Sequence, residues 1–202
     1  MKEPEFSIII CPNNSASLLK KTLDSLMRQN FKDFELVIVD RNSIDDTKVS
    51  IEKYKKFFRE KLRWMNLDNE SLMEAMNEGV KMAKGKYLNI LEAGEEIGEN
   101  SLELALKSAQ KYPQADVVYG VRNIWEVSKQ KRGLLNIMAE TLPIKNTQRL
   151  SLYYKKELHN QFGFYGLENN VAVDYAFCLK AFYLGEAIVR PFDLITRKVI
   201  KS

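Results

Sequence analysis

Three glutamates follow a short apolar run at residues 87–91, and a glycine lies among them. The sequence reads LEAGEE, which places Glu92, Glu95 and Glu96 around Gly94. The apolar run is typical of a buried strand, and carboxylates at a strand end are suited to binding a divalent metal ion or to acting as general bases. The simpler interpretation is a solvated turn. The elements that position these residues decide between the two.

Three further polar clusters lie at the ends of predicted strands. Apolar runs at residues 6–11 and 34–39 predict buried strands, and residues 62–67 are predicted to form a third strand. The three end in CPNNS, DRNSIDD and LDNES. Each cluster alone would be an ordinary turn. Four clusters that converge on one edge of a sheet would instead form a ligand site, and we expect one here.

Helical patterns separate these strands. Apolar residues recur at helical spacing in residues 19–26, 47–58, 71–83 and 101–112, and a further strand is predicted at 117–127. Strands that alternate with helices in this way predict an α/β fold with a mostly parallel central sheet and helices on both faces. In such a sheet the carboxyl ends of the strands share one edge.

The second half of the chain has a weaker pattern. We expect a long loop over residues 128–148, a short helix at 155–162, a longer helix at 172–184, and strands at 186–191 and 194–200. No repeat and no boundary between domains is evident. The 202 residues are therefore expected to form a single domain.

The amino-acid composition limits the classes of function that the chain can have. The chain is 45% hydrophobic with a net charge of +4, which suits a globular core and does not indicate nucleic-acid binding. Basic clusters in the second half fit either a solvated face or a surface for anionic ligands or a membrane. Cys11 and Cys178 lack metal-type spacing and are expected to be buried thiols.

No signal peptide and no apolar run of the roughly 18 residues needed to span a membrane is visible. We therefore expect a cytoplasmic protein, with a peripheral association at the inner face of a membrane left open.

The predicted crevice is rich in oxygen ligands, and the sequence has neither a dinucleotide-binding nor a P-loop fingerprint. Its candidate residues are Asp40, Asn42, Ser43, Asp45, Asp46, Glu92 and Glu95. Hard oxygen ligands suit Mg²⁺ or Mn²⁺, ions that bind phosphates in turn.

Two segments carry a resemblance to a known family. The sequences FSIIICPNNSASLLKKTLDSLMRQNFKDFELVIVDRNSIDDT and LMEAMNEGVKMAKGKYLNILEAGEE resemble the first blocks of family 2 glycosyltransferases, which have the GT-A fold. The later segment AVDYAF resembles the start of the helix that carries the general base in that family. The resemblance implies a nucleotide-binding half at residues 1–127 and an acceptor-side half at 128–202.

The resemblance also implies roles for single residues. It assigns Glu95 and Glu92 to the metal, Asp40 to the nucleotide base and Asp174 to general-base catalysis. The remaining residues expected to bind the nucleotide sugar are Pro12, Asn14, Asn42, Ser43 and Asn77.

The implied function is an enzyme of polysaccharide biosynthesis. It would move a sugar from a nucleotide-diphosphate sugar, such as a UDP-sugar, to a hydroxyl of a saccharide or lipid-linked acceptor, with inversion and with Mn²⁺ or Mg²⁺. The chain departs from the family pattern at Glu95, where Asp is usual, and at Arg41, where Asp or Gly is usual.

Two alternatives stay open. One is a glycosyltransferase-like domain that binds a nucleotide or a protein partner without transferring sugar. The other is a nucleotidyltransferase of related fold, although the glycine-rich basic loop expected after its first strand is missing.

Overall fold

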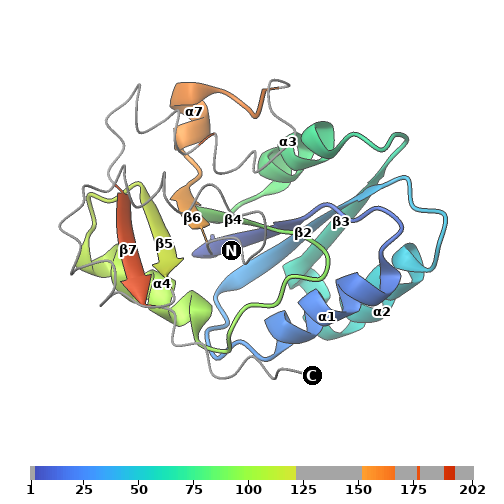
Figure 1. Ribbon diagram of the computed structural model, residues 1–202, viewed down its shortest axis with the longest axis horizontal. Helices are drawn as coiled ribbons and strands as arrows, with labels where there is room; N and C mark the ends of the chain where they lie inside the picture. The colour runs from blue at the N-terminus through green and yellow to red at the C-terminus, as the bar shows by residue number, and fades with distance from the viewer. Residues whose placement is uncertain (1–2, 122–151, 167–176, 178–188, 194–202) are drawn as a thin grey trace.

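A computed structural model of the chain describes residues 3–121, 152–166, 177 and 189–193. The strands in this part form one seven-stranded sheet in the order β3-β2-β1-β4-β6-β5-β7 (Figure 1). The strands are β1 (Phe6–Ile10), β2 (Phe34–Arg41), β3 (Leu62–Leu67), β4 (Tyr87–Leu91), β5 (Val117–Val121), β6 (Leu152–Lys155) and β7 (Val189–Asp193). Only β6 runs antiparallel to its neighbours among these described strands, so the predicted mostly parallel sheet is confirmed.

Helices cover both faces of the sheet, as predicted. They are α1 (Ala16–Met27), α2 (Thr47–Phe58), the 3₁₀ turn η1 (Arg59–Lys61), α3 (Leu72–Met82), α4 (Ser101–Lys111) and α7 (Leu158–Phe162). The helices α1, α2 and α4 pack on one face, and α3 and α7 pack on the other (Figure 1). Each face therefore has its own hydrophobic core.

The central strand β1 shows how the sequence builds two cores at once. Side chains alternate across a strand, so Ile8 and Ile10 enter the core under α1 and α2, whereas Ile9 enters the core under α3. All three are fully buried. A parallel strand covered on both faces needs a nearly continuous apolar run rather than an alternating one, and residues 6–10 provide it with Ser7 as the exception.

A buried polar network fixes the end of the sheet opposite the predicted site. The Ser7 hydroxyl donates to Glu35 Oε1 at 2.6 Å and accepts from the Gly85 N–H at 2.8 Å. Arg63 pairs with the other oxygen of Glu35 at 2.7 Å, so the buried charge is compensated. A Cβ at Gly85 would lie 2.5 Å from the Ser7 backbone nitrogen, so this close approach requires glycine.

The strands and helices predicted for residues 6–112 agree with the structure, and β5 occupies Val117–Val121 of the strand predicted at 117–127, the rest of which lies outside the described residues. The main error lies in the second half. We predicted a helix over residues 155–162, but β6 occupies Leu152–Lys155 and α7 begins only at Leu158. Pairing with β4 and β5 makes this short segment a strand. Most of the predicted 172–184 helix and the predicted strand at 194–200 lie outside the described residues.

Within the described residues, none of the helices is long and apolar enough to cross a membrane.

Candidate functional site

The first four strands bring the predicted polar clusters to one edge of the sheet. The strands β3, β2, β1 and β4 are neighbours and run parallel. The loops that follow them therefore leave the same edge, in that order. This is the place where open parallel sheets bind ligands.

The loops after β1 and β2 are joined to each other. The Arg41 N–H donates to the Pro12 carbonyl at 2.9 Å, and the Asn14 N–H donates to Ser43 Oγ at 2.9 Å. Asn14 and Asn42 have φ angles of 45° and 53°, in the left-handed region that asparagine tolerates better than most residues. The structure thus brings together four of the residues predicted to bind the nucleotide sugar.

Asp40 lies in the same place but faces inward. It is fully buried, and its carboxylate accepts hydrogen bonds from the Ser43 N–H at 3.0 Å and from the Ser43 hydroxyl at 2.6 Å. Lys48 Nζ lies 3.9 Å from Asp40 Oδ2. This arrangement makes Asp40 a positioning residue for the loop. Direct contact with a nucleotide base stays a prediction that the buried placement of Asp40 does not favour.

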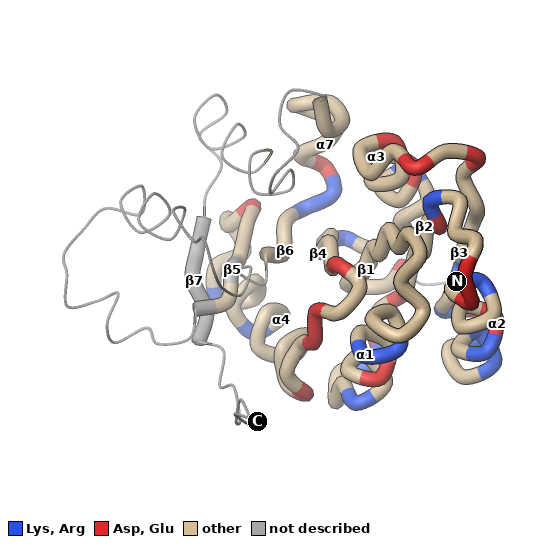
Figure 2. The backbone as a smooth tube through the Cα atoms, turned by 45° about the vertical axis from the view of Figure 1, so that its right-hand side comes forward, with Lys and Arg blue, Asp and Glu red and all other residues tan. Residues whose placement is uncertain are grey.

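The acidic turn after β4 folds tightly on itself. The Glu92 N–H donates to Glu95 Oε2 at 2.7 Å, and the Glu95 N–H donates to the Glu92 carbonyl at 3.0 Å. Gly94 has a φ of 103°, which favours glycine at this point of the turn. Glu92 and Glu95 therefore lie together at the carboxyl end of β4. Figure 2 shows acidic residues in the loop between β4 and α4.

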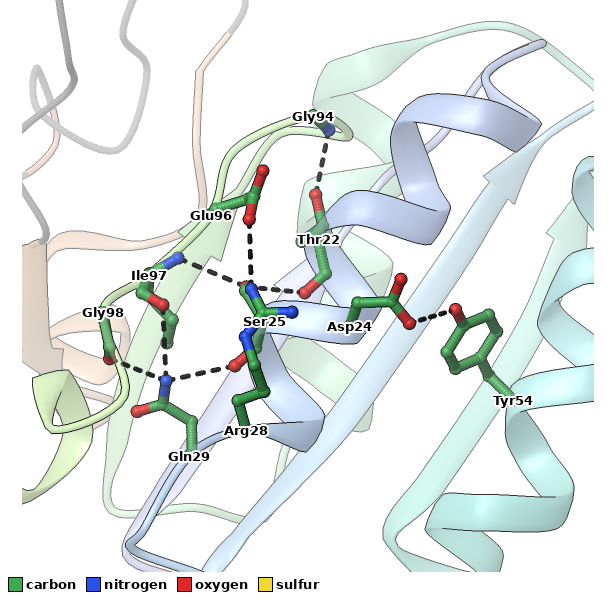
Figure 3. Close-up of polar contacts among 10 residues, drawn as sticks. All are labelled: Thr22, Asp24, Ser25, Arg28, Gln29, Tyr54, Gly94, Glu96, Ile97 and Gly98. Atoms are coloured by element: carbon green, nitrogen blue, oxygen red, sulfur yellow. Dashed lines mark hydrogen bonds and ion pairs between the residues drawn. The ribbon is translucent and has the colours of Figure 1, made fainter. Parts of the chain in front are cut away.

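Buried polar side chains of α1 hold this turn in place (Figure 3). The hydroxyl of Thr22 accepts from the Gly94 N–H at 2.9 Å. One turn further along the helix, the hydroxyl of Ser25 accepts from the Ile97 N–H at 3.2 Å and donates to the Thr22 carbonyl at 2.8 Å. Both side chains are fully buried. Two successive turns of α1 thus fix the backbone of the acidic loop.

The end of α1 anchors the loop a third time. Gln29 is also fully buried, and its Nε2 donates to the Gly98 carbonyl at 2.7 Å while its Oε1 accepts from the Leu102 N–H at 3.3 Å. Arg28 pairs with Glu96 at 3.1 Å on the surface. The sequence pattern predicted no role for α1 in the site. Polar residues on the same helix face as the buried leucines were the signal that was missed.

The acidic turn fits a divalent ion that shares its coordination with a ligand. Within the described residues, no group of three or more His, Cys, Asp and Glu side chains forms a complete metal site. Mg²⁺ typically takes one or two carboxylates from the protein and completes its shell with phosphates and water. Glu92 and Glu95 supply a donor set of that kind.

Asn77 was predicted to bind the nucleotide sugar, and the structure joins its side chain to a different part of the chain. Its Nδ2 donates to the Tyr165 carbonyl at 3.1 Å, and its Oδ1 accepts from the Tyr165 N–H at 3.0 Å. Both ends of the amide are thus paired with one residue of the segment that follows α7. Contact with the nucleotide sugar stays a prediction for Asn77.

An aromatic cluster packs behind this segment. The ring of His159 stacks on Phe177 with centroids 4.2 Å apart. Its Nδ1–H donates to the Gly163 carbonyl at 2.9 Å, which leaves Nε2 to accept from the Tyr154 hydroxyl at 3.1 Å. Burial lowers the pKa of His159 below its ordinary value. The cluster therefore contains a neutral, hydrogen-bonded histidine. The predicted general base, Asp174, lies outside the described residues.

Comparisons with known proteins agree with the sequence resemblance. A family model described as glycosyl transferase family 2 matches residues 7–174. A PGL/p-HBAD biosynthesis glycosyltransferase of Mycobacterium bovis is 30% identical over 183 residues, which are 90% of this chain and 71% of that protein. A protein of the same name in Mycobacterium tuberculosis matches to the same extent.

Two solved structures show the same fold. TarS 1-349 of S. aureus has a TM-score of 0.71 and 23% identity, and the match covers 96% of this chain and 58% of that one. The mannosyltransferase PcManGT from Pyrobaculum calidifontis, solved with GDP-Man and Mn2+, has a TM-score of 0.74 and 20% identity, covering 98% and 59%.

The chain spans less than two thirds of both solved chains. The likeness to them confirms the predicted GT-A fold, and the match to the family model confirms the predicted enzyme class. The chain belongs to glycosyl transferase family 2.

Proposed function

We propose that this chain transfers a sugar from a nucleoside-diphosphate sugar to a hydroxyl group, with inversion and with the help of a divalent ion. The observation that carries the proposal is the anchored turn of Glu92 and Glu95 at the end of β4. It lies at the same sheet edge as the joined loops after β1 and β2. Neighbours of the same fold were solved with UDP or with GDP-Man and Mn2+, which supports a donor and an ion of these kinds.

The proposed chemistry gives each acid a role. Asp174 would take the proton of the acceptor hydroxyl, and the oxygen would attack the anomeric carbon from the side opposite the diphosphate. The bond from that carbon to the diphosphate oxygen would break, and the configuration would invert. An ion held by Glu92 and Glu95 would stabilise the charge on the departing diphosphate.

The anchoring of the acidic turn has its own part in this proposal. Backbone bonds to Thr22 and Ser25 fix the turn before any ligand arrives. Carboxylates on a fixed backbone lose little conformational freedom when an ion binds, and such preorganised charge is the main source of electrostatic stabilisation in enzymes. The helix α1 therefore belongs to the proposed active site as its support.

The acceptor we propose is a saccharide or a lipid-linked glycan, and the setting is polysaccharide biosynthesis. The mycobacterial relatives are named for a biosynthetic glycosyltransferase, which agrees with this setting. We place the reaction in the cytoplasm, with a peripheral contact to a membrane where the acceptor is lipid-linked.

The test is the release of free nucleoside diphosphate from a panel of nucleotide sugars, with candidate acceptors, in the presence and absence of Mn²⁺. We expect release with at least one donor, dependent on acceptor and metal. Binding of a nucleoside diphosphate without release from any donor would instead support a domain that binds nucleotides and transfers nothing. Absence of any binding would reject both.

A further inference from the structure

Arg41 is the residue of β2 that extends across the predicted crevice. It follows the inward-facing Asp40, and successive side chains of a strand point to opposite faces. Asp40 is fully buried, whereas Arg41 is partly exposed at the last position of the strand. The group presented to a ligand at this strand end is therefore a guanidinium and not a carboxylate.

The Arg41 guanidinium is held by backbone carbonyls on both sides. Its Nε donates to the Cys11 carbonyl at 3.1 Å, just after β1. Its Nη1 donates to the Glu70 carbonyl at 2.8 Å, in the loop between β3 and α3. The planar group thus lies across the end of β2 with its orientation fixed.

The two hydrogen bonds to backbone carbonyls use only some of the N–H donors of Arg41. A guanidinium carries five N–H donors and no acceptor. Among the described residues, the Arg41 side chain has no partner besides the Cys11 and Glu70 carbonyls. No carboxylate among these residues pairs with it. The remaining N–H groups are therefore available to a ligand that offers acceptors.

The strand order indicates which part of a nucleotide sugar comes near Arg41. Strands lie about 4.8 Å apart, so the end of β2 is roughly 10 Å from the end of β4, with β1 between them. If the diphosphate lies at the acidic turn after β4, a nucleoside that extends over β1 towards β2 would bring its base to the guanidinium of Arg41.

We propose that Arg41 selects nucleotides whose base carries a carbonyl oxygen where adenine carries its amino group, such as uracil and guanine, over adenine. This inference rests on the proposed function. Uracil O4 and guanine O6 accept hydrogen bonds, whereas the adenine amino group is itself a donor. A guanidinium has only donors, so it pairs with the carbonyl oxygen of uracil or guanine. With adenine, the N–H group of the guanidinium would instead face the N–H group of the amino substituent, and no hydrogen bond would form between them.

The test compares UDP, GDP and ADP by calorimetry with Mn²⁺ present. We expect the wild type to bind UDP or GDP at least about tenfold more tightly than ADP, within the range that one base-reading side chain provides. Arg41→Ala should weaken the carbonyl-bearing nucleotide and bring its preference over ADP to within about threefold. Lys53→Ala, which removes one positive charge from the exposed surface of α2, is the charge-matched control and should leave the preference unchanged.

Arg41→Gln gives a second readout and covers the case in which the alanine variant does not fold. Glutamine offers both a donor and an acceptor and pairs with the adenine edge, so the preference should shift towards ADP. Equal weakening of all three nucleotides in the Arg41 variants would overturn the proposal and assign Arg41 to the phosphates. The absence of any preference among the three nucleotides in the wild type would also overturn the proposal. If no nucleotide binds the wild type at all, the proposed function itself fails.

Discussion

The Asn77 amide pairs with both backbone polar groups of Tyr165, 88 residues away in the sequence. These two bonds tie α3 to the segment after α7. Asn77→Ala removes both partners and leaves a backbone N–H and carbonyl unsatisfied, so the free energy of unfolding should fall by about 1–3 kcal/mol. Urea denaturation followed by circular dichroism measures this change.

Asn160 provides the control for that experiment. It is an exposed asparagine of α7, and Asn160→Ala should stay within about 0.5 kcal/mol of the wild type. Equal stability of the Asn77 and Asn160 variants would mean that water replaces the pairing with Tyr165 at no cost.

Glu95 and its neighbour Glu96 should respond differently to loss of charge. Glu95→Gln keeps an oxygen that can accept from the Glu92 N–H, so the turn should survive while a metal ligand is lost. We expect Mn²⁺-dependent binding of UDP to weaken by at least about tenfold, or roughly 1.4 kcal/mol, by calorimetry. Glu96→Gln breaks only a half-exposed pair with Arg28 and should change little. Unchanged binding in both variants would make the acidic loop a solvated turn.

Asp174→Asn separates binding from chemistry. If Asp174 is the general base, this variant should bind the donor as the wild type does, and transfer should slow by about 10²- to 10⁴-fold. Donor binding by calorimetry and turnover by nucleotide release are the two measurements. Turnover near that of the wild type would assign the base to another residue.

The buried His159 should make stability depend on pH in a narrow window. Burial lowers its pKa in the folded chain below the ordinary value of 6.5, so the unfolded chain binds the proton more readily. Stability should therefore fall as the pH drops through 6.5, and it should be insensitive to this group above that value. Lys156 is a nearby positive charge that acts in the same direction.

The measurement is the midpoint of urea unfolding at several pH values between about 7.5 and 5.5, a window in which His is the side chain that ordinarily titrates. His159 is the one histidine of the sequence. His159→Gln should lower the midpoint at every pH and flatten its dependence. A wild-type midpoint that stays constant across the window would show that the histidine is protonated as easily in the folded chain as in the unfolded one.

The fold of the first half was predictable because local pattern and tertiary environment agree there. The run at residues 6–10 is apolar except for Ser7 and lies in the centre of a sheet covered on both faces. The strand β6 was not predictable in the same way. Its sequence, LYYK, is too short for a periodic signal, and pairing with two strands that lie far away in the sequence decides its conformation.

The convergence of the polar loops was predictable, and the orientation of their single side chains was not. Parallel strands bring their ends together whatever the side chains are, so the convergence of the polar loops followed from topology. The direction of a single carboxylate does not follow from topology. Asp40 turns inward because Ser43, three residues later, offers it two hydrogen-bond donors, and only the three-dimensional structure shows that pairing.

The insertion of β6 between β4 and β5 has a consequence for synthesis of the chain. A ribosome delivers β1 to β5 first, and β6 follows only after a further thirty residues, 122–151. Until then the edges of β4 and β5 that β6 will join have no partner in the sheet. Unpaired edges recruit strands from other molecules. The nascent polypeptide that ends before Leu152 should therefore be prone to aggregation through these two edges.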